Sequence, residues 1–398
     1  MAENKQDKRP NVPPLRFPEF TNEWKQTTIG ESFELYSGNT PSRLEKEQFA
    51  GDINWITSGE LKNHYISKTN ETITKKAAEN NNLRLLPTGT FVIAIYGLEA
   101  AGVRSTGSIT SELSTISQAC MAFLPKAEIS NEFLYSWYMK HGNTIGLRYA
   151  QGTKQQNLSY DIIEKFRISY PNKEEQQKIE RFICLLDQRI AVQSKLIEDL
   201  KQLKSALVER IYCQHIPNCK IGDLVVQVSK RNRGDNDYSV LSVNNRLGFI
   251  EQSDQFEDRS VASDDTSNYK VVSRDDFAYN PARINVGSIA RLTSFESGIV
   301  SPMYICFHTK KQLLPQYLEH FFDTRYFYYE MQKRLEGSVR LCLSWEGLCN
   351  IPIAVPPIER QEKVGKRISR LADKISLEKR HLNLLKSQKQ YLLQAMFI

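Results

Sequence analysis

Basic and amide side chains recur at predicted turns in both halves of the chain, often close to glycine. Arginine and lysine suit guanine edges and phosphates, whereas asparagine and glutamine suit adenine edges. Each such residue taken alone is more often a solvated surface group, but their mixture in both halves predicts contacts with double-stranded DNA. The candidates are Arg43, Arg104, Arg148, Lys154, Gln155, Gln156 and Asn157 in the first half, and Lys230, Arg231, Arg233, Arg246, Arg283, Asn285, Arg291 and Arg340 in the second.

Signatures of enzyme chemistry are incomplete wherever they occur. Gly97 and Gly102 have the spacing of a phosphate-binding loop, but the Lys-Ser/Thr pair that reaches phosphates and Mg²⁺ is missing. Residues 280–283, Asn-Pro-Ala-Arg, begin like the Asn-Pro-Pro-Tyr loop of amino-methyltransferases but lack the aromatic residue that holds a target base. The acidic pairs at 264–265 and 275–276 have no lysine at nuclease-like spacing. We therefore expect no catalytic centre.

The composition is that of a globular chain that can accept a polyanionic partner. It has 398 residues, 40% hydrophobic side chains and a net charge of +7, and roughly 150 residues per domain predicts two to three domains. Its apolar runs fall short of the roughly 20 residues of a membrane span, and residues 1–10 lack the apolar core of a secretory signal. Seven cysteines without a C-x-x-C pair predict free thiols, no metal site and a cytoplasmic location.

The chain contains an internal duplication. Residues 152–212 overlay residues 337–397 at a constant offset of 185 residues, without a gap. In this overlay Leu158 falls on Leu343. Upstream, Ile29-Gly30-Glu31 falls on Ile221-Gly222-Asp223 at an offset of 192 residues. A repeat of about half the chain indicates a duplicated domain rather than a solenoid.

Each half ends in a long helical pattern that follows a proline, Pro171 or Pro356. Apolar residues alternate at spacings of four and three, as in the seam of a coiled coil. This pattern predicts two long helices that pair antiparallel; the alternative is an ordinary amphipathic helix packed on its own domain. The seam residues are Ile179, Ile183, Leu186, Ile190, Ile197, Leu200, Leu207 and Ile211 in the first helix, and Val364, Ile368, Leu371, Ile375, Leu382, Leu385, Leu392 and Met396 in the second.

Both helices also carry apolar residues outside the seam. Two helices alone cannot bury faces that wide, so either the globular domains or a partner protein must cover them. We expect a partner protein over part of this surface. The residues concerned are Val192, Leu196, Leu203, Leu377, Leu384, Tyr391 and Leu393.

The globular parts mix short strands, turns and a helix, which predicts the α+β class with two similar domains separated by the antiparallel helices in a pseudo-two-fold arrangement. The expected strands are 91–95, 117–124, 271–272, 276–279 and 303–308, and the expected helices are 131–141 and 314–329, with Phe133, Trp137, Tyr138, Phe321, Phe322, Tyr326 and Tyr328 in the cores. The expected parts are a flexible N-terminal segment (1–22), globular domain 1 (23–171), long helix 1 (172–215), globular domain 2 (216–356) and long helix 2 (357–398).

These features together resemble the specificity (S) subunit of type I restriction-modification systems, over nearly the whole chain. The resemblance is carried by the two helix openings, Pro171-x-x-x-Glu175-Gln176-x-x-Ile179 and Pro356-x-x-Glu359-x-Gln361-x-x-Val364, by Gly152-Thr153-x-Gln155-x-Asn157-Leu158-Ser159, and by Leu15-Arg16-Phe17-Pro18-Glu19-Phe20 leading to Trp24. The second half departs from the first with Arg360 in place of Glu175, and with Arg340-Leu341-Cys342 in place of Gln155-Gln156-Asn157.

The resemblance implies two target recognition domains, each reading one half of a split DNA site. It also implies that the helices set the spacing of the half-sites and dock methyltransferase (M) subunits, two of them, which nuclease/translocase (R) subunits join. In that family S-adenosylmethionine belongs to M and ATP to R, so no cofactor is expected on this non-catalytic chain. The alternatives are a coiled-coil protein-interaction scaffold that does not read DNA, and an enzyme of the nuclease or methyltransferase class.

Overall fold

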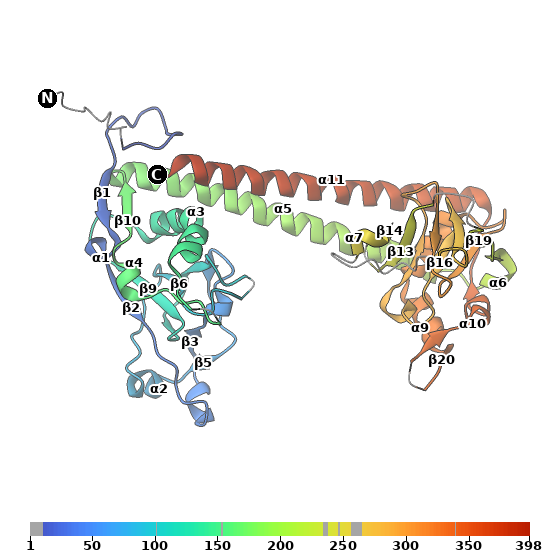
Figure 1. Cartoon of the computed structure of the whole chain (residues 1–398), viewed down its shortest axis with the longest axis horizontal. Coiled ribbons are helices and arrows are strands. Elements are labelled where there is room, and N and C mark those ends of the chain that lie inside the picture. Colours follow the sequence, from blue (N-terminus) through green and yellow to red (C-terminus); the bar gives the residue numbers. More distant parts are fainter. Residues whose placement is uncertain are drawn as a thin grey trace. The chain divides into compact units, whose positions relative to one another are not determined.

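The computed structural model describes residues 11–100, 102–152, 154–233, 238–245, 247–255, 265–338 and 340–398. The chain divides into two compact units: unit 1 comprises Met1–Gln193 with His381–Ile398, and unit 2 comprises Ser194–Arg380. Each unit joins a globular part to portions of two long helices, α5 (Lys173–Cys213) and α11 (Ile358–Met396). Both globular parts combine mainly antiparallel strands with short helices (Figure 1), as expected for the α+β class.

The globular part of unit 1 is built on a five-stranded sheet of order β2-β9-β6-β7-β4 and a three-stranded sheet of order β5-β3-β8. The central strand β6 places Phe91 opposite both Phe123 of β9 and Ile109 of β7. The strands are β1 (Lys25–Thr28), β2 (Phe33–Ser37), β3 (Ile53–Ile56), β4 (Tyr65–Ile66), β5 (Thr72–Ile73), β6 (Phe91–Ala94), β7 (Gly107–Thr110), β8 (Ser114–Ile116), β9 (Cys120–Pro125) and β10 (Arg167–Tyr170). The helices are α1 (Ile29–Ser32), α2 (Lys75–Asn80), α3 (Asn131–Tyr149) and α4 (Tyr160–Ile163), with 3₁₀ turns at Lys46–Phe49 and Ser58–Glu60.

Unit 2 repeats this plan in its central sheet, whose order β12-β19-β16-β17 matches β2-β9-β6-β7. Its second sheet, β14-β13-β18-β15, keeps a parallel pair, β13 with β18, as β3 pairs with β8 in unit 1. The strands are β11 (Cys219–Lys220), β12 (Val225–Val228), β13 (Val240–Asn244), β14 (Gly248–Glu251), β15 (Lys270–Ser273), β16 (Phe277–Tyr279), β17 (Ile289–Arg291), β18 (Ser297–Val300), β19 (Ile305–Thr309), β20 (Leu335–Glu336), β21 (Cys342–Leu343) and β22 (Pro352–Ile353). The helices are α6 (Ile221–Leu224), α7 (Gln252–Gln255), α8 (Pro315–Phe322), α9 (Arg325–Gln332) and α10 (Trp345–Cys349), with a 3₁₀ turn at Ile284–Val286.

The structure corrects two of the helices expected from sequence. The segment 314–329 is not one helix but two, α8 and α9, because Thr324 donates its hydroxyl to the carbonyl of Phe321 and accepts from the amide of Phe327, which caps a new helix. The break rotates Tyr328 outwards, so this predicted core residue is 51% exposed. In unit 1, α3 runs beyond the expected 131–141 as far as Tyr149.

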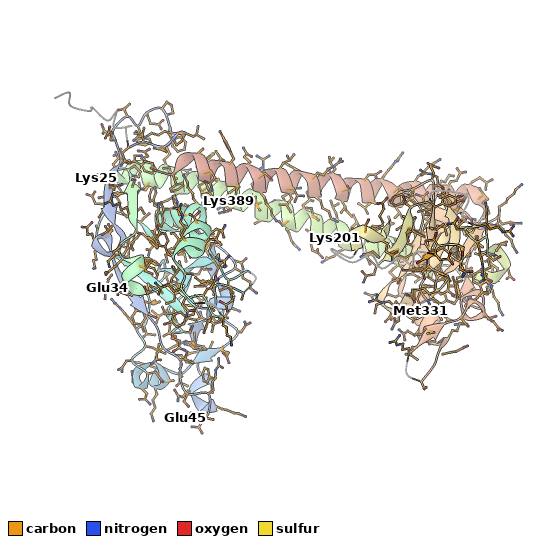
Figure 2. The ribbon with its side chains drawn as sticks, viewed as in Figure 1. Lys25, Glu34, Glu45, Lys201, Met331 and Lys389 are labelled. Atoms are coloured by element: carbon orange, nitrogen blue, oxygen red, sulfur yellow. The ribbon has the colours of Figure 1, made fainter. Side chains whose placement is uncertain are left out.

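The two long helices run antiparallel within each unit. In unit 1, Ile183 near the start of α5 shares a hydrophobic core with Leu392 near the end of α11. Asp187 of α5 also forms an ion pair of 2.5 Å with Lys389, which Figure 2 labels on α11. In unit 2, Tyr212 near the end of α5 lies in the same core as Ile368 near the start of α11.

Every predicted seam residue is buried or half-buried, as a helical face in contact with protein requires. Leu393, expected outside the buried seam, is only 6% exposed because it belongs to the core of unit 1 together with Phe397. The rest of the expected outer apolar set is exposed: Val192, Leu196, Leu203, Leu377, Leu384 and Tyr391.

A buried glutamine joins each long helix to its globular part. Gln176 of α5 donates to the carbonyls of Glu128 and Pro171, at 3.0 Å each, and accepts from the amide of Ser130. Gln361 of α11, its counterpart at the offset of 185, donates to the carbonyls of Gln312 and Pro356 and accepts from the amide of Leu314. Both side chains are 1% exposed. This repeated lock fixes the start of α5 on α3 and the start of α11 on α8.

The start of the described chain is also fixed in place. The flexible segment expected over 1–22 is, in its described part from Asn11 onwards, packed on α5: Arg16 forms an ion pair with Glu175 and Phe17 packs edge-on against Phe182. The described part of this segment departs from the expectation because Arg16 finds a buried acid 159 residues further along the chain. Among the described residues, no helix is long and apolar enough to cross a bilayer.

Candidate DNA interface

One backbone contact brings the candidate loops together in both units. In unit 1 the amide of Leu158 donates to the carbonyl of Ile95 at 2.8 Å, and in unit 2 the amide of Leu343 donates to the carbonyl of Pro281 at 3.0 Å. Leu158 and Leu343 are equivalent in the duplication. The loop that follows β6 or β16 therefore lies beside the loop that precedes α4 or α10 in each unit.

In unit 1 these two loops are held together by several hydrogen bonds. Asn157 exchanges backbone hydrogen bonds of 2.9 Å with Gln151, and its side-chain oxygen accepts from the amide of Gly97. The carboxylate of Glu99 accepts from the amide of Gln156 at 2.7 Å, and this backbone hydrogen bond lowers the pKa of Glu99. The loops are thus ordered by their own polar groups, and Asn157 has a structural role.

The side chains in and beside this loop pair differ in their exposure to solvent. Arg104 donates to the side-chain oxygen of Gln156 at 2.7 Å and is half-buried, whereas Lys154, Gln155 and Arg148 are exposed. The Nε of Arg104 is buried and has no hydrogen-bond partner in the described part of the chain. Lys154 and Gln155 are therefore the groups of this loop pair that are best placed to reach a ligand.

The corresponding turns of unit 2 present different side chains. Arg283 is exposed and Asn285 half-buried in the turn between β16 and β17, and Arg340 is exposed between β20 and β21. Gly337 has φ of +116°, and a Cβ there would lie 2.3 Å from the carbonyl oxygen of Arg340. Gly152 has the same conformation in unit 1, with φ of +113°. Glycine at both positions permits the same tight loop.

A basic cleft opens after β12 in unit 2. Lys230, Arg231 and Arg233 are exposed around a cavity of about 760 Å³ that Tyr238 also lines. The amide of Val271 donates to the carbonyl of Lys230 at 2.8 Å, which ties the cationic segment to the adjacent strand β15. Three cations in one cleft suit a phosphate backbone.

Sequence reasoning named the cations of this cleft but missed its other lining residues. Tyr238 and Ser267 lie outside the basic run, and the amide oxygen of Asn268 accepts from Arg231 at 2.7 Å. Ser267 and Asn268 come from a segment more than 30 residues away in the sequence, so only the paired strands could bring them here. The signal that could have found them is the cluster of small polar residues just before β15.

Two predicted DNA-binding residues are engaged in ion pairs within their own unit. Arg291 pairs with Asp275 at 2.9 Å and with Glu319 at 2.8 Å. Arg43 pairs with Glu71 through two hydrogen bonds, and its guanidinium lies 4.7 Å from the ring centre of Phe49. Both guanidinium groups already have protein partners and are poor candidates for base contacts. Arg246 lies outside the described residues.

The described residues hold no group of three or more histidine, cysteine or acidic side chains that could bind a metal ion. Burial raises the pKa of Cys120 and of Cys306 to about 12, so these thiols stay protonated and unreactive near neutral pH. The geometry thus offers exposed cations and amides in anchored loops, which suits nucleic-acid binding.

Comparison with known proteins identifies a domain of this chain. Residues 21–202 match the family model of the type I restriction modification DNA specificity domain. The type I restriction enzyme MjaIX specificity subunit of Methanocaldococcus jannaschii is 29% identical over 199 residues, 49% of this chain and 45% of that protein. The EcoR124I/EcoR124II specificity subunit of Escherichia coli is 28% identical over 176 residues, 44% and 43% of the two chains. The chain thus spans less than half the length of these relatives.

Two solved structures share the fold over nearly all of the chain. The S subunit of a type I restriction-modification system from M. genitalium aligns with a TM-score of 0.58 at 16% identity, covering 97% of this chain and 99% of that one. A chain from a structure of complex assembly and conformational transition in a type I R-M system aligns with a TM-score of 0.60 at 12% identity, covering 96% and 98%. The predicted fold class and the resemblance to S subunits are confirmed, and residues 21–202 match the type I restriction modification DNA specificity domain.

Proposed function

We propose that this chain is the non-catalytic, DNA-sequence-reading specificity subunit of a type I restriction-modification complex, and that each unit reads one half of a bipartite site. The observation that carries this proposal is a shared loop scaffold with unlike exposed side chains. Equivalent leucines anchor the loop, yet the residues before them are Lys154 and Gln155 in unit 1, and Arg340 and Leu341 in unit 2. Similar scaffolds with different contact groups suit two half-sites of different sequence.

The exposed apolar residues of the long helices support a role in assembly. Val192 and Leu203 of α5 are 69% and 57% exposed, and Leu384 and Tyr391 of α11 are 69% and 66% exposed. Repeated large apolar side chains on a solvent-facing helix favour a protein partner. In this proposal the helices set the spacing of the half-sites and dock two M subunits, and R subunits join the complex in the cytoplasm. S-adenosylmethionine then binds to M and ATP to R.

Binding to duplex DNA tests the proposal against a scaffold that does not read DNA. With the M subunit present, the logarithm of the affinity for random duplex should fall linearly with the logarithm of the salt concentration, because cations that contact phosphates displace counterions. Absent or salt-insensitive binding would support the scaffold instead. Methyl transfer or DNA cleavage by the purified chain alone would show that it is an enzyme.

A further inference from the structure

In unit 1 the segment that precedes β1 docks in a groove between the start of α5 and the end of α11. The amide of Leu15 donates to the carbonyl of Ala395 at 2.9 Å. Arg16 donates two hydrogen bonds of 2.7 Å to the carboxylate of Glu175, which is 1% exposed. The indole of Trp24 donates to the same carboxylate, and Trp24 is 3% exposed. A bidentate pair with a buried acid anchors this segment.

Four further side chains complete the docking. Phe17 packs edge-on against Phe182 of α5, with ring centres 6.0 Å apart. The ammonium of Lys178 lies 4.6 Å from the centre of the Phe17 ring and pairs with Glu19. The groove therefore accepts an extended peptide through one buried acid, one cation and an aromatic surface.

Unit 2 contains the equivalent groove, but no segment of the described chain fills it. A cavity of about 750 Å³ lies between the end of α5 and the start of α11. The buried glutamines Gln176 and Gln361, with their matching partners, establish that the starts of the two helices are equivalent. At the offset of 192 residues, Ile216 stands where unit 1 has Trp24, yet Ile216 is 90% exposed. The docking segment of unit 1 thus has no counterpart here.

The charge of the groove is inverted between the units. At the offset of 185, Arg360 replaces Glu175, Arg367 replaces Phe182 and Arg210 replaces Ala395, while Lys363 keeps the cation of Lys178. All four basic residues are exposed and line the cavity, together with a single acid, Glu359.

The inverted groove lacks anionic partners of its own. Within the described residues, none of its four basic side chains has an ion pair within 4 Å, and Arg360 instead contacts the ring of His215 at 2.9 Å. Four like charges on one short stretch of surface repel each other and favour an anionic ligand. The floor of the cavity is apolar, since Val364 is buried and Leu207 and Ile211 are half-buried.

We propose that the groove lined by Arg210, Arg360, Lys363 and Arg367 binds an extended, carboxylate-bearing segment of a partner protein. A carboxylate of that segment pairs with Arg360 in the place where Arg16 pairs with Glu175. A peptide fits better than a nucleic acid because the same groove in unit 1 holds a peptide and because the floor is apolar. The chain's own residues 1–10 do not suit the groove, since they carry three basic and two acidic residues. The inference does not depend on DNA reading.

Fluorescent peptides test the proposal on the full chain. Two peptides spanning residues 11–24 are compared by fluorescence anisotropy at low salt, one with the natural Arg16 and one with Arg16→Glu. The groove of unit 1 is already filled by the chain's own segment. The glutamate peptide should therefore bind about tenfold more tightly than the arginine peptide, which corresponds to about 1.4 kcal/mol. In the variant Arg360→Glu, the preference should reverse.

The matched control is Arg370→Glu on the same helix, an exposed residue outside the cavity, which should leave both affinities unchanged. Equal affinity for the two peptides, no binding of the glutamate peptide, or a preference that survives Arg360→Glu would overturn the proposal. If Arg360→Glu instead weakens binding of random duplex DNA and the peptides do not bind, the groove is a DNA contact. Circular dichroism checks that the variants are folded.

Discussion

In unit 1, ion pairs join the long helices to the globular part, whereas in unit 2 a cavity lies at the equivalent place. In unit 1, His64 lies stacked between Tyr65 and Tyr135, with ring centres 4.2 and 4.0 Å apart. Its Nδ1 lies 3.4 Å from a carboxylate oxygen of Asp187 on α5, and Asp187 also pairs with Lys389 on α11. One histidine therefore links the globular part to both helices.

In unit 2 the same position lacks its carboxylate. At the offset of 185, Ala372 stands where unit 1 has Asp187, and Lys204 stands where unit 1 has Lys389. A cavity of about 530 Å³ lies at this place, lined by three lysines, of which Figure 2 labels Lys201, and by Asp323, whose carboxylate lies 3.9 Å from the ammonium of Lys204. Unit 1 thus has an ion pair between the two helices at this place, whereas unit 2 has a cavity.

A neutral histidine lies near this opening. Both ring nitrogens of His320 are buried and have no hydrogen-bond partner among the described residues. Burial, together with the nearby charges of Lys204 and Arg291, lowers the pKa of His320 to about 4, so the ring is uncharged at neutral pH. A histidine beside two carboxylates thus has a raised pKa in one unit, whereas a buried histidine beside two cations is neutral in the other.

The comparison shows which contacts two related units share and which they do not. The glutamine locks and the leucine-anchored loops recur because they satisfy backbone groups, whose positions the fold dictates. The ionic contacts at the helices differ because each depends on a single side chain. Shared backbone contacts keep the scaffold, and unlike side chains give each unit its own surface.

The largest effect is expected from removing the ring of Phe397, the residue that follows α11, from the core of unit 1. Phe397 is fully buried, with its ring centre 5.0 Å from that of Phe133. Phe397→Ala should lower the free energy of unfolding by about 3–5 kcal/mol, measured by urea denaturation. The control Tyr391→Ala, on the exposed face of the same helix, should change it by less than about 0.5 kcal/mol. Similar costs for the two variants would show that the end of α11 is not part of the core.

The glutamine locks should contribute almost equally in the two units. Gln176→Ala or Gln361→Ala leaves one half-buried amide and two carbonyls without their partner, which should cost about 2–3 kcal/mol of unfolding free energy in each case. Urea denaturation of the two variants measures both values. A loss in only one unit would mean that the starts of the two helices are not equivalent.

The histidine link predicts a pH dependence that belongs to unit 1. Burial alone would lower the pKa of His64, but the carboxylates of Asp187, 3.4 Å from Nδ1, and of Glu132, 2.9 Å from Nε2, outweigh it and raise the pKa above 6.5. The charged form is therefore stabilised by folding, so this contribution is complete below pH 6.5 and is lost as the pH rises through the raised value. His64→Gln should remove this loss from urea midpoints measured between about pH 6 and pH 9, whereas the control His308→Gln should keep it. An unchanged pH profile in His64→Gln would contradict the link.

The smallest effect is expected from restoring the missing acid in unit 2. Ala372→Asp places a carboxylate opposite Lys204, as Asp187 lies opposite Lys389, and should raise the free energy of unfolding by about 0.5 kcal/mol at low salt. The uncharged control Ala372→Asn should give no such gain. If both substitutions destabilise the chain equally, the position of Ala372 in unit 2 is not structurally equivalent to that of Asp187 in unit 1.

The periodic features of the fold could be predicted from sequence, whereas contacts between distant segments could not. Burial follows the seam of α5 and α11 because a helix repeats its face every few residues. The break at Thr324 was missed, since a side-chain cap competes locally with an otherwise continuous helical pattern. Arg291 was predicted to contact DNA, because nothing in its local sequence indicates its ion pair with Glu319. The DNA-binding candidates were predicted from residue type. Only the structure of the paired loops shows which of these side chains are exposed.

The central claim is that each unit reads its own half of a DNA site. The direct measurement maps the methylated sequence in DNA modified by the chain assembled with M subunits and S-adenosylmethionine, for three chains: wild type, Lys154→Ala/Gln155→Ala, and Arg340→Ala. We predict that the double variant relaxes recognition in one half of the site and Arg340→Ala in the other, each leaving the opposite half unchanged. Equal loss in both halves with either variant, or a target without two separate parts, would contradict the account.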